Sequence, residues 1–220
     1  IIETVNKELA GKYLWLFPKS NILIYPQSKI GAVLESKFKS IQSVSLSVKS
    51  DKGLWVFLSE REPKYTWCGD ALPASGSEEK CYFMDESGYI FSEAPFFSGK
   101  VYFRFYGLPG VNGEDPLGSY YLKQNFTGLV HFNDLLLSMG LKPEKAYIDE
   151  NGDTYIYLAK TTASKTVPEL ILRDDADFEK VAENLQAALG TEPLQSKFKN
   201  EYSLLQYIDL RFDNKVYDKF

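Results

Sequence analysis

The feature that most constrains the fold is a proline between two runs of strand-like sequence. The run KGLWVFLSE, residues 52–60, is followed by Arg-Glu-Pro at residues 61–63, and a second run with Trp67 and Cys68 begins at once. Because proline has no N–H to donate to a sheet, continuous strand pairing is disrupted there. We therefore predict that one sheet ends at residues 61–63 and that the sheet of a second domain begins.

The first domain, residues 1–62, has the pattern of two helices followed by a hairpin. Apolar residues four apart over residues 1–9 predict a short helix, and residues 27–38 place four apolar side chains on one helical face. Residues 41–50 then alternate between apolar and serine, and the run that ends before the proline is their antiparallel partner. A hairpin is a narrow sheet, so we expect a further strand upstream of Ile1.

The second domain, residues 63–220, alternates short strands with turns. Helical spacing of apolar residues predicts helices within 127–140 and 176–190. The run KAYIDENGDTYIYLAK, residues 145–160, contains the Asn-Gly pair of a tight hairpin turn, and residues 204–220 are predicted to form two further strands. We therefore predict an α+β chain, with a small helix-helix-hairpin domain and then a mixed, mainly antiparallel β domain covered by two helices.

Charge and hydropathy exclude several classes of protein. The 25 Lys and Arg residues stand against 30 Asp and Glu, and no basic cluster of the nucleic-acid-binding type is present. No window reaches the roughly 18 to 20 apolar residues of a membrane span. Since the chain begins at Ile1 rather than Met, we expect it to be an excised portion of a longer protein.

The two cysteines, Cys68 and Cys81, flank a polar loop in strand-like sequence. A hairpin brings such positions together, which favours a disulfide and an oxidising, extracytoplasmic compartment. The alternative is a pair of buried free thiols.

Residues suited to catalysis are scarce. His131 is the one histidine and lies within a predicted helix, no Gly-x-Ser-x-Gly motif is present, and His and Cys are too few for a zinc site. Asp174 and Asp175 suit a helix N-terminus, where they stabilise the dipole. Asn125 matches an N-glycosylation acceptor, a pattern that is common by chance.

A calcium loop is suggested only superficially by Asp149, Asn151 and Asp153. Gly152 comes one position before Asp153 instead of after it, and Lys160 occupies the place of the bidentate glutamate. A solvated hairpin turn is the better interpretation. We therefore predict no catalytic residue, no cofactor and no metal site.

The last strand of the chain allows two interpretations. Its aromatic residues either build the core of the sheet or border an exposed edge, where unpaired backbone groups allow another chain to add a strand.

Three separated stretches together resemble the FtsQ/DivIB family of bacterial cell-division proteins. The first is the hairpin that ends in Glu60, Arg61, Glu62 and Pro63 and is followed by Trp67. The second is CYFMDESGYIF, residues 81–91, and the third is the Tyr-Ile-Asp-Leu-Arg signature at 207–211. Their order and spacing cover nearly the whole chain.

This resemblance implies a noncatalytic scaffold of the divisome. Such a protein has one membrane span, here expected outside this chain, and an extracytoplasmic part made of a POTRA domain and a β domain. It binds FtsB/DivIC-like and FtsL-like coiled-coil membrane proteins and helps regulate septal peptidoglycan synthesis. The first predicted domain would be the POTRA domain, without its first strand.

The partner-docking residues implied by the resemblance follow or end the third motif: Arg211, Phe212, Asn214, Val216 and Tyr217. Glu60, Arg61 and Pro63 are predicted to form a second contact site or an interdomain hinge. The cysteines and the long loop between them depart from the family pattern.

Two other functions stay open. A secretion or outer-membrane assembly component would use a POTRA-like domain to receive unfolded chains. A hydrolase of cell-wall polymers would need paired carboxylates, and the sequence does not identify such a pair.

Overall fold

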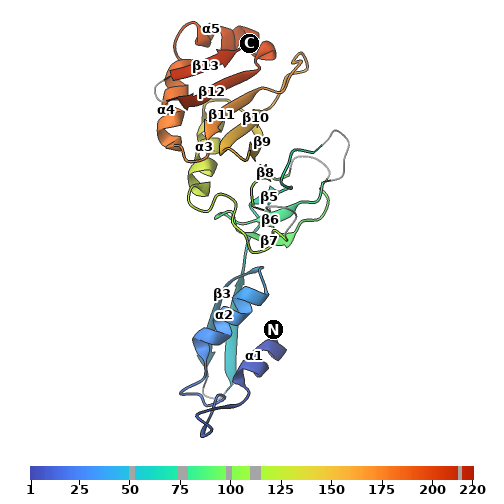
Figure 1. Cartoon of the computed structure of the whole chain (residues 1–220), viewed down its shortest axis with the longest axis vertical. Helices are drawn as coiled ribbons and strands as arrows, with labels where there is room; N and C mark the ends of the chain where they lie inside the picture. Colours follow the sequence, from blue (N-terminus) through green and yellow to red (C-terminus); the bar gives the residue numbers. More distant parts are fainter. Residues whose placement is uncertain (50–52, 74–78, 98–100, 110–114, 213–214) are drawn as a thin grey trace. The chain divides into compact units, whose positions relative to one another are not determined.

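The chain divides between Glu62 and Pro63 into two compact units, which we call unit 1 (Ile1–Glu62) and unit 2 (Pro63–Phe220). The computed structural model describes residues 1–49, 53–73, 79–97, 101–109, 115–212 and 215–220. The division coincides with the proline at which strand-like sequence stops and starts again. Each unit is described by itself below (Figure 1).

Unit 1 contains the two predicted helices and the predicted hairpin. Its elements are α1 (Ile2–Leu9), β1 (Lys12–Tyr13), β2 (Phe17–Pro18), α2 (Gln27–Lys37), β3 (Ile41–Val48) and β4 (Leu54–Glu60). Strands β3 and β4 pair antiparallel over their whole length. The small β1–β2 hairpin was not predicted, because two-residue strands carry no periodic signal.

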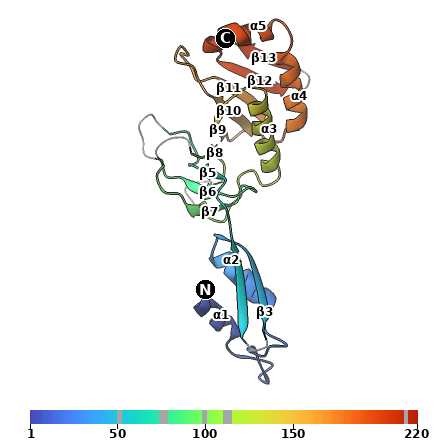
Figure 2. The same cartoon turned by 180° about the vertical axis from the view of Figure 1, so that it is seen from behind.

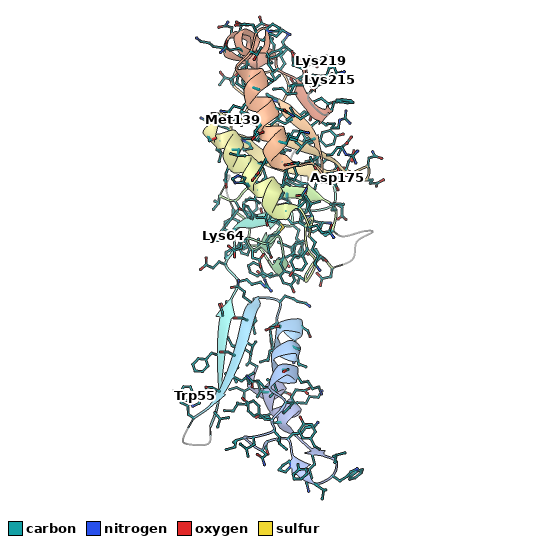
Figure 3. All side chains as sticks on the ribbon, turned by 90° about the vertical axis from the view of Figure 1, so that its left-hand side faces the viewer. Trp55, Lys64, Met139, Asp175, Lys215 and Lys219 are labelled. Atoms are coloured by element: carbon teal, nitrogen blue, oxygen red, sulfur yellow. A yellow bond between two sulfur atoms is a disulfide. The ribbon has the colours of Figure 1, made fainter. Side chains whose placement is uncertain are left out.

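The core of unit 1 is small. Val5, Ile30, Leu34 and Leu46 form its buried cluster, and they come from α1, α2 and β3. Trp55 projects from the face of the hairpin that is turned away from the two helices (Figure 3). The serines that alternate along β3 share that outer face, so it is exposed to solvent, as expected of a half-buried sheet.

Unit 2 is built on one nine-stranded sheet with the order β13-β12-β11-β10-β9-β8-β5-β6-β7. The strands are β5 (Tyr65–Trp67), β6 (Tyr82–Met84), β7 (Ile90–Glu93), β8 (Arg104–Gly107), β9 (Pro143–Ile148), β10 (Asp153–Leu158), β11 (Glu169–Arg173), β12 (Tyr207–Phe212) and β13 (Lys215–Lys219). Five neighbouring pairs are antiparallel, while β5–β8, β8–β9 and β11–β12 are parallel. The predicted mixed, mainly antiparallel sheet is confirmed.

Helices α3 (Phe126–Ser138) and α4 (Phe178–Leu189) lie on one face of this sheet, as Figures 1 and 2 show. Side chains that point to the helices, such as Ile156, Leu170 and Ile208, are fully buried. A further helix, α5 (Leu194–Glu201), and a 3₁₀ turn (Tyr202–Leu204) precede β12. Helix α5 was missed because LQSKFKNE contains only two apolar residues.

The other face of the sheet has no helix on it in the described part of the chain, and tyrosines line it. The rings of Tyr147 and Tyr155 stack with centroids 6.0 Å apart. The Nζ of Lys145 lies 4.9 Å from the ring centroid of Tyr157. Rings and long side chains cover the backbone on this face, where the sheet meets solvent.

Strand β8 shows why a glycine is needed at its end. At its end Gly107 has φ +82°, and an added Cβ would lie 1.9 Å from the carbonyl oxygen of Ile148. The indole Nε1 of Trp67 donates a hydrogen bond to the Gly107 carbonyl at 2.9 Å. Glycine therefore allows β8 to approach both neighbouring strands closely.

Candidate partner-docking edge

The two edges of the nine-stranded sheet differ. A loop covers the β7 edge: the Ile90 N–H donates to the Ser119 carbonyl, and the Tyr121 N–H donates to the Gly88 carbonyl, both at 2.9 Å. Strand β13 at the opposite edge pairs with β12 alone among the residues that the structure describes. Because an unpaired edge is a template for a further strand, β13 is the edge suited to receive one.

The β12–β13 pairing contains an irregularity. Between the paired positions Asp209–Tyr217 and Phe212–Lys215, two residues of β12 lie opposite one residue of β13. Such a β-bulge bends the strand and redirects a side chain. Arg211 is one of the two residues in the bulge.

The side chain of Arg211 is held inside unit 2. Its Nη2 and Nε donate to the Asp209 carboxylate at 2.7 and 3.0 Å, and its Nη1 donates to Asp153 of β10. The hydrogen bonds to Asp209 and then Asp153 raise the pKa of the guanidinium above its usual range. Arg211, predicted as a partner contact, therefore ties the bulged hairpin to the centre of the sheet.

The remaining predicted docking residues separate into two groups. Val216 is half-buried and packs against the core of unit 2. Phe212 and Tyr217 are 50% and 49% exposed, and their rings meet edge to face with centroids 5.2 Å apart. Asn214 lies outside the described residues. We call the combination of β13 with the Phe212 and Tyr217 rings the docking edge.

A hollow of about 580 Å³ lies beside the docking edge, between α4 and the β12–β13 hairpin. Leu210, Phe212 and Tyr217 supply apolar surface to it. Its charged lining has four cations and two carboxylates: Arg173, Lys180, Arg211, Lys215, Asp175 and Asp177. Figure 3 shows Lys215 and Lys219 on β13 and Asp175 on the same side of unit 2, with Met139 on the opposite side. The hollow is thus suited to an apolar side chain that has an acidic neighbour.

Some of the charged side chains around this hollow form ion pairs within unit 2, and others do not. Arg173 makes a two-pronged ion pair with Asp175, with N–O distances of 2.8 and 3.1 Å. In the described part of the chain no ion pair is seen for Lys180 or Lys215. These two lysines are therefore the cations that a partner carboxylate would meet.

Cys68 and Cys81 form a disulfide, with Cα atoms 4.1 Å apart, so the alternative of two free thiols does not hold. The bridge joins the end of β5 to the start of β6. Beside it, Glu79 accepts hydrogen bonds from Arg104 at 3.3 Å and from the Tyr106 hydroxyl at 3.0 Å. Disulfides are characteristic of chains that fold outside the cytoplasm, so this bond indicates an extracytoplasmic location.

The predicted second site lies at the boundary of the units. Glu60 ends β4 and is exposed, and Pro63 begins unit 2. The Arg61 N–H donates to the Ser40 carbonyl at 2.8 Å, and its Nε donates to the Lys39 carbonyl at 3.2 Å. Arg61 thus holds the end of β4 against the start of β3, and a contact role for these residues stays a prediction.

The acidic turn that resembled a calcium loop is a hairpin turn. Asp149 Oδ1 accepts hydrogen bonds from the N–H groups of Asn151 and Asp153, each at 2.9 Å. This confirms the turn prediction and leaves the carboxylate committed to its own backbone. His131 is exposed on the surface of α3.

Asn125, the acceptor residue of the glycosylation motif, forms side-chain hydrogen bonds within unit 2. Its Nδ2 donates to the carbonyls of Asp174 and Ala176 at 2.9 and 3.2 Å. A glycan would replace one of the two hydrogens on this nitrogen, so the two bonds could not both be kept. The residue is better explained as a tie between α3 and the start of α4.

Sequence reasoning missed Asp153 and Lys180 as neighbours of the docking edge. Asp153 lies 58 residues before Arg211, and Lys180 belongs to another helix, so no local pattern connects them. Only the parallel placement of β12 beside β11 brings them together.

Comparisons with models of known protein families and with curated proteins find no match for this chain. No helix in the described residues has the length and apolar character needed to cross a bilayer.

Proposed function

We propose that this chain is the extracytoplasmic part of a noncatalytic bacterial division scaffold of the FtsQ/DivIB type, which binds an extended segment of an FtsB/DivIC-like or FtsL-like partner along β13. The observation that carries the proposal is the asymmetry of the sheet. Its β7 edge is covered by a loop, while β13 pairs on one side only in the described residues.

The motifs behind the resemblance occupy structurally meaningful places, which supports the proposal. The Glu-Arg-x-Pro run coincides with the boundary of the two units. The Tyr-Ile-Asp-Leu-Arg run forms most of β12, the strand next to the open edge, and its Asp and Arg form an ion pair beside the bulge. The motif residues therefore lie on the strand that pairs with β13 and support the docking edge.

The docking edge defines the chemistry of its partner. An added strand would gain backbone hydrogen bonds from β13, and its alternate side chains would give specificity. One apolar side chain would contact the Phe212 and Tyr217 rings, and an acidic residue next to it would meet Lys180 or Lys215. The partner segment is thus extended, amphipathic and acidic.

Calorimetric titration of the full chain with the extracytoplasmic segment of the FtsB/DivIC-like protein from the same genome tests the proposal. Phe212→Ala and Tyr217→Ala should each weaken binding on the order of tenfold, since exposed aromatic anchors at the centre of an interface dominate its energy. Phe96→Ala is the matched control, because Phe96 is a more exposed ring of unit 2 away from the docking edge.

Two further measurements separate strand addition from ordinary side-chain contact. A partner segment with N-methylated backbone amides keeps its side chains but loses the backbone donors, so its binding should be lost. Hydrogen exchange should slow in β13 and stay unchanged in β7.

Binding that survives N-methylation, or protection that appears only in β7, would contradict strand addition at β13. Absence of binding to both the FtsB/DivIC-like and FtsL-like segments, together with capture of unfolded polypeptide, would favour the secretion or assembly alternative.

A further inference from the structure

The connection between α1 and α2 presents an unusual amount of apolar surface. Leu14 is 82% exposed and Trp15 is 92% exposed, and Leu23 is 86% exposed. Leu16, Phe17, Ile22 and Ile24 are exposed as well. We call residues 14–17 and 22–24 the apolar loop. Large apolar side chains left exposed within one short connection of a folded unit point to an interaction site.

The apolar loop has a defined backbone. Tyr13 pairs with Phe17 in the β1–β2 hairpin, and the Leu16 N–H donates to the Tyr13 carbonyl at 3.0 Å. In the second half, the Leu23 N–H donates to the Asn21 side chain at 3.0 Å. The apolar side chains are therefore presented by two tight turns.

The turn at the tip is conformationally unfavourable for the residues that form it. Leu14 and Trp15 have φ values of 47° and 63°, in the left-handed region that bulky residues rarely adopt. Neither side chain gains burial in return, since both are almost fully exposed. A local cost without a compensating contact inside the fold indicates that the contact lies outside it.

The charge around the apolar loop selects the kind of partner. Residues 10–26 contain Lys12 and Lys19 and no acidic residue. Unit 1 as a whole carries nine Lys and Arg against six Asp and Glu, a net charge of +3, whereas the whole chain has −5. Segments that lie at a membrane interface typically combine Trp, Tyr and Lys with aliphatic residues, as this loop does.

The shape of the apolar loop points the same way. It extends past the ends of α1 and α2 within unit 1 (Figures 1 and 2). Its side chains thus come from a protruding tip that is suited to enter a soft medium, rather than from a flat strand face such as that of Trp55 and Phe57.

We propose that the apolar loop inserts into the interface of an anionic lipid bilayer, with Leu14 and Trp15 among the acyl chains and Lys12 and Lys19 at the headgroups. The loop would dock unit 1 on the membrane surface. This inference does not depend on the proposed division function, because it rests only on residues of unit 1.

Fluorescence quenching by brominated lipids tests the insertion directly. The full chain is mixed with vesicles of phosphatidylcholine and phosphatidylglycerol in equal parts, with brominated acyl chains, and with vesicles of phosphatidylcholine alone. Trp15 should be quenched on the anionic vesicles. Trp15→Phe should remove the quenching, and Trp55→Phe should leave it, because Trp55 is an exposed indole elsewhere on unit 1.

A second variant separates binding from folding. Leu14→Asn with Trp15→Gly places residues that tolerate positive φ at the tip. This double variant should lower vesicle affinity on the order of a hundredfold, because it removes two large apolar side chains. It should also raise the thermal unfolding midpoint of unit 1, which a variant with damaged folding would not do.

Lys12 and Lys19 should each contribute a smaller part of the vesicle affinity than the apolar tip. Lys12→Ser with Lys19→Ser should weaken binding to the anionic vesicles about fivefold for each lysine, which corresponds to about 1 kcal/mol per cation near an anionic surface. Quenching that persists in Trp15→Phe, or absence of vesicle binding by the folded full chain, would overturn the proposal. Equal binding to the neutral and anionic vesicles would overturn the headgroup role of the lysines.

Discussion

Unit 1 and unit 2 distribute their apolar residues and charges in opposite ways. Among the described residues, the buried apolar cluster of unit 1 has four side chains and that of unit 2 has 22. Unit 1 has a net charge of +3, while unit 2, with 16 Lys and Arg against 24 Asp and Glu, has −8. The smaller unit exposes a tryptophan at a loop tip, and the larger unit exposes a strand edge.

The difference follows from size. A domain of about 60 residues buries a smaller share of its surface than one of about 150, so fewer of its side chains are needed to close the core. Apolar residues beyond that number are free for contacts outside the fold, as in the apolar loop. Unit 2 buries most of its apolar side chains between the helices and the sheet. The surface that it offers to a partner is therefore mainly the backbone of β13, at the docking edge.

The largest expected effect comes from deleting a core side chain in each unit. Phe105 touches the rings of Tyr121 and Phe126, and Phe105→Ala should cost about 3–5 kcal/mol of unit 2 stability. Leu34→Ala should cost about 2–5 kcal/mol, which is enough to unfold unit 1 because its core is small. Hydrogen exchange read separately for each unit measures both.

Leu137→Ala is the control for this pair, since Leu137 is 54% exposed on α3. Loss of protection in unit 2 on replacing Leu34 would contradict the separation of the two units, because it would show that they unfold together.

The disulfide should give the next largest effect, confined to unit 2. Cys68 and Cys81 are 13 residues apart, and opening a loop of this size costs about 3 kcal/mol by chain entropy. Cys68→Ser with Cys81→Ser should lower the denaturant midpoint of unit 2 and leave unit 1 unchanged. Reduction of the unaltered chain should reproduce the shift, and an equal shift in unit 1 would argue against separate units.

An ion-pair comparison has a smaller expected effect. Arg211→Met leaves the buried Asp209 carboxylate without its cation, and the loss should be about 1 kcal/mol because the arginine is partly exposed to screening water. Arg211→Lys should not restore it, since an ammonium cannot make the same fork. Faster exchange of the β12–β13 amides is the readout.

The ion pair chosen for comparison in unit 1 joins Lys29 Nζ to Glu8 Oε2 at 2.8 Å, and its lysine is well exposed. Lys29→Met should therefore leave stability unchanged. An equal loss for both variants would show that burial does not distinguish these pairs.

The smallest effect is a dependence on alkaline pH. Burial, and for Tyr106 also its hydrogen bond to Glu79, raises the pKa of Tyr106 and of Tyr157 to about 12. Unfolded tyrosine titrates near pH 10. The contribution of these two tyrosines to the stability of unit 2 should therefore be complete below about pH 10 and decrease as the pH rises toward 12, because in that window each of them loses its proton in the unfolded chain but keeps it in the folded one.

Denaturant unfolding across this pH range measures the slope. Tyr157→Phe should flatten it, while Leu137→Ala, which removes no ionisable group, should not. A slope that the Tyr157 variant leaves unchanged would contradict the assignment.

Much of the local structure was predictable, because it depends on neighbours in sequence. Helices α1 to α4 follow from apolar spacing, and the turn at Asn151 follows from an Asn-Gly pair that is set by Asp149. The β1–β2 hairpin and α5 were not predictable, since their stretches are too short or too polar to show a period.

The candidate site was predicted only in part. Phe212 and Tyr217 were expected at the docking edge and do project from it, but Val216 packs inward and Arg211 is held by two carboxylates. The alternation of a strand separates Val216 from Tyr217, and this was implicit in the sequence. The contact between the Asp153 carboxylate and Arg211 was not predictable from the sequence, because two strand pairings, β10–β11 and β11–β12, bring these residues together.

Four properties of this chain follow from residue type and local period: the α+β class, the change of sheet at Pro63, the pair of cysteines able to meet across a loop, and the aromatic character of the last strand. Three others became visible only in the folded chain: which sheet edge is open, which charges meet at the bulge, and the exposure of the Leu14 and Trp15 side chains. These depend on which distant segments pack together, and no local pattern encodes that packing.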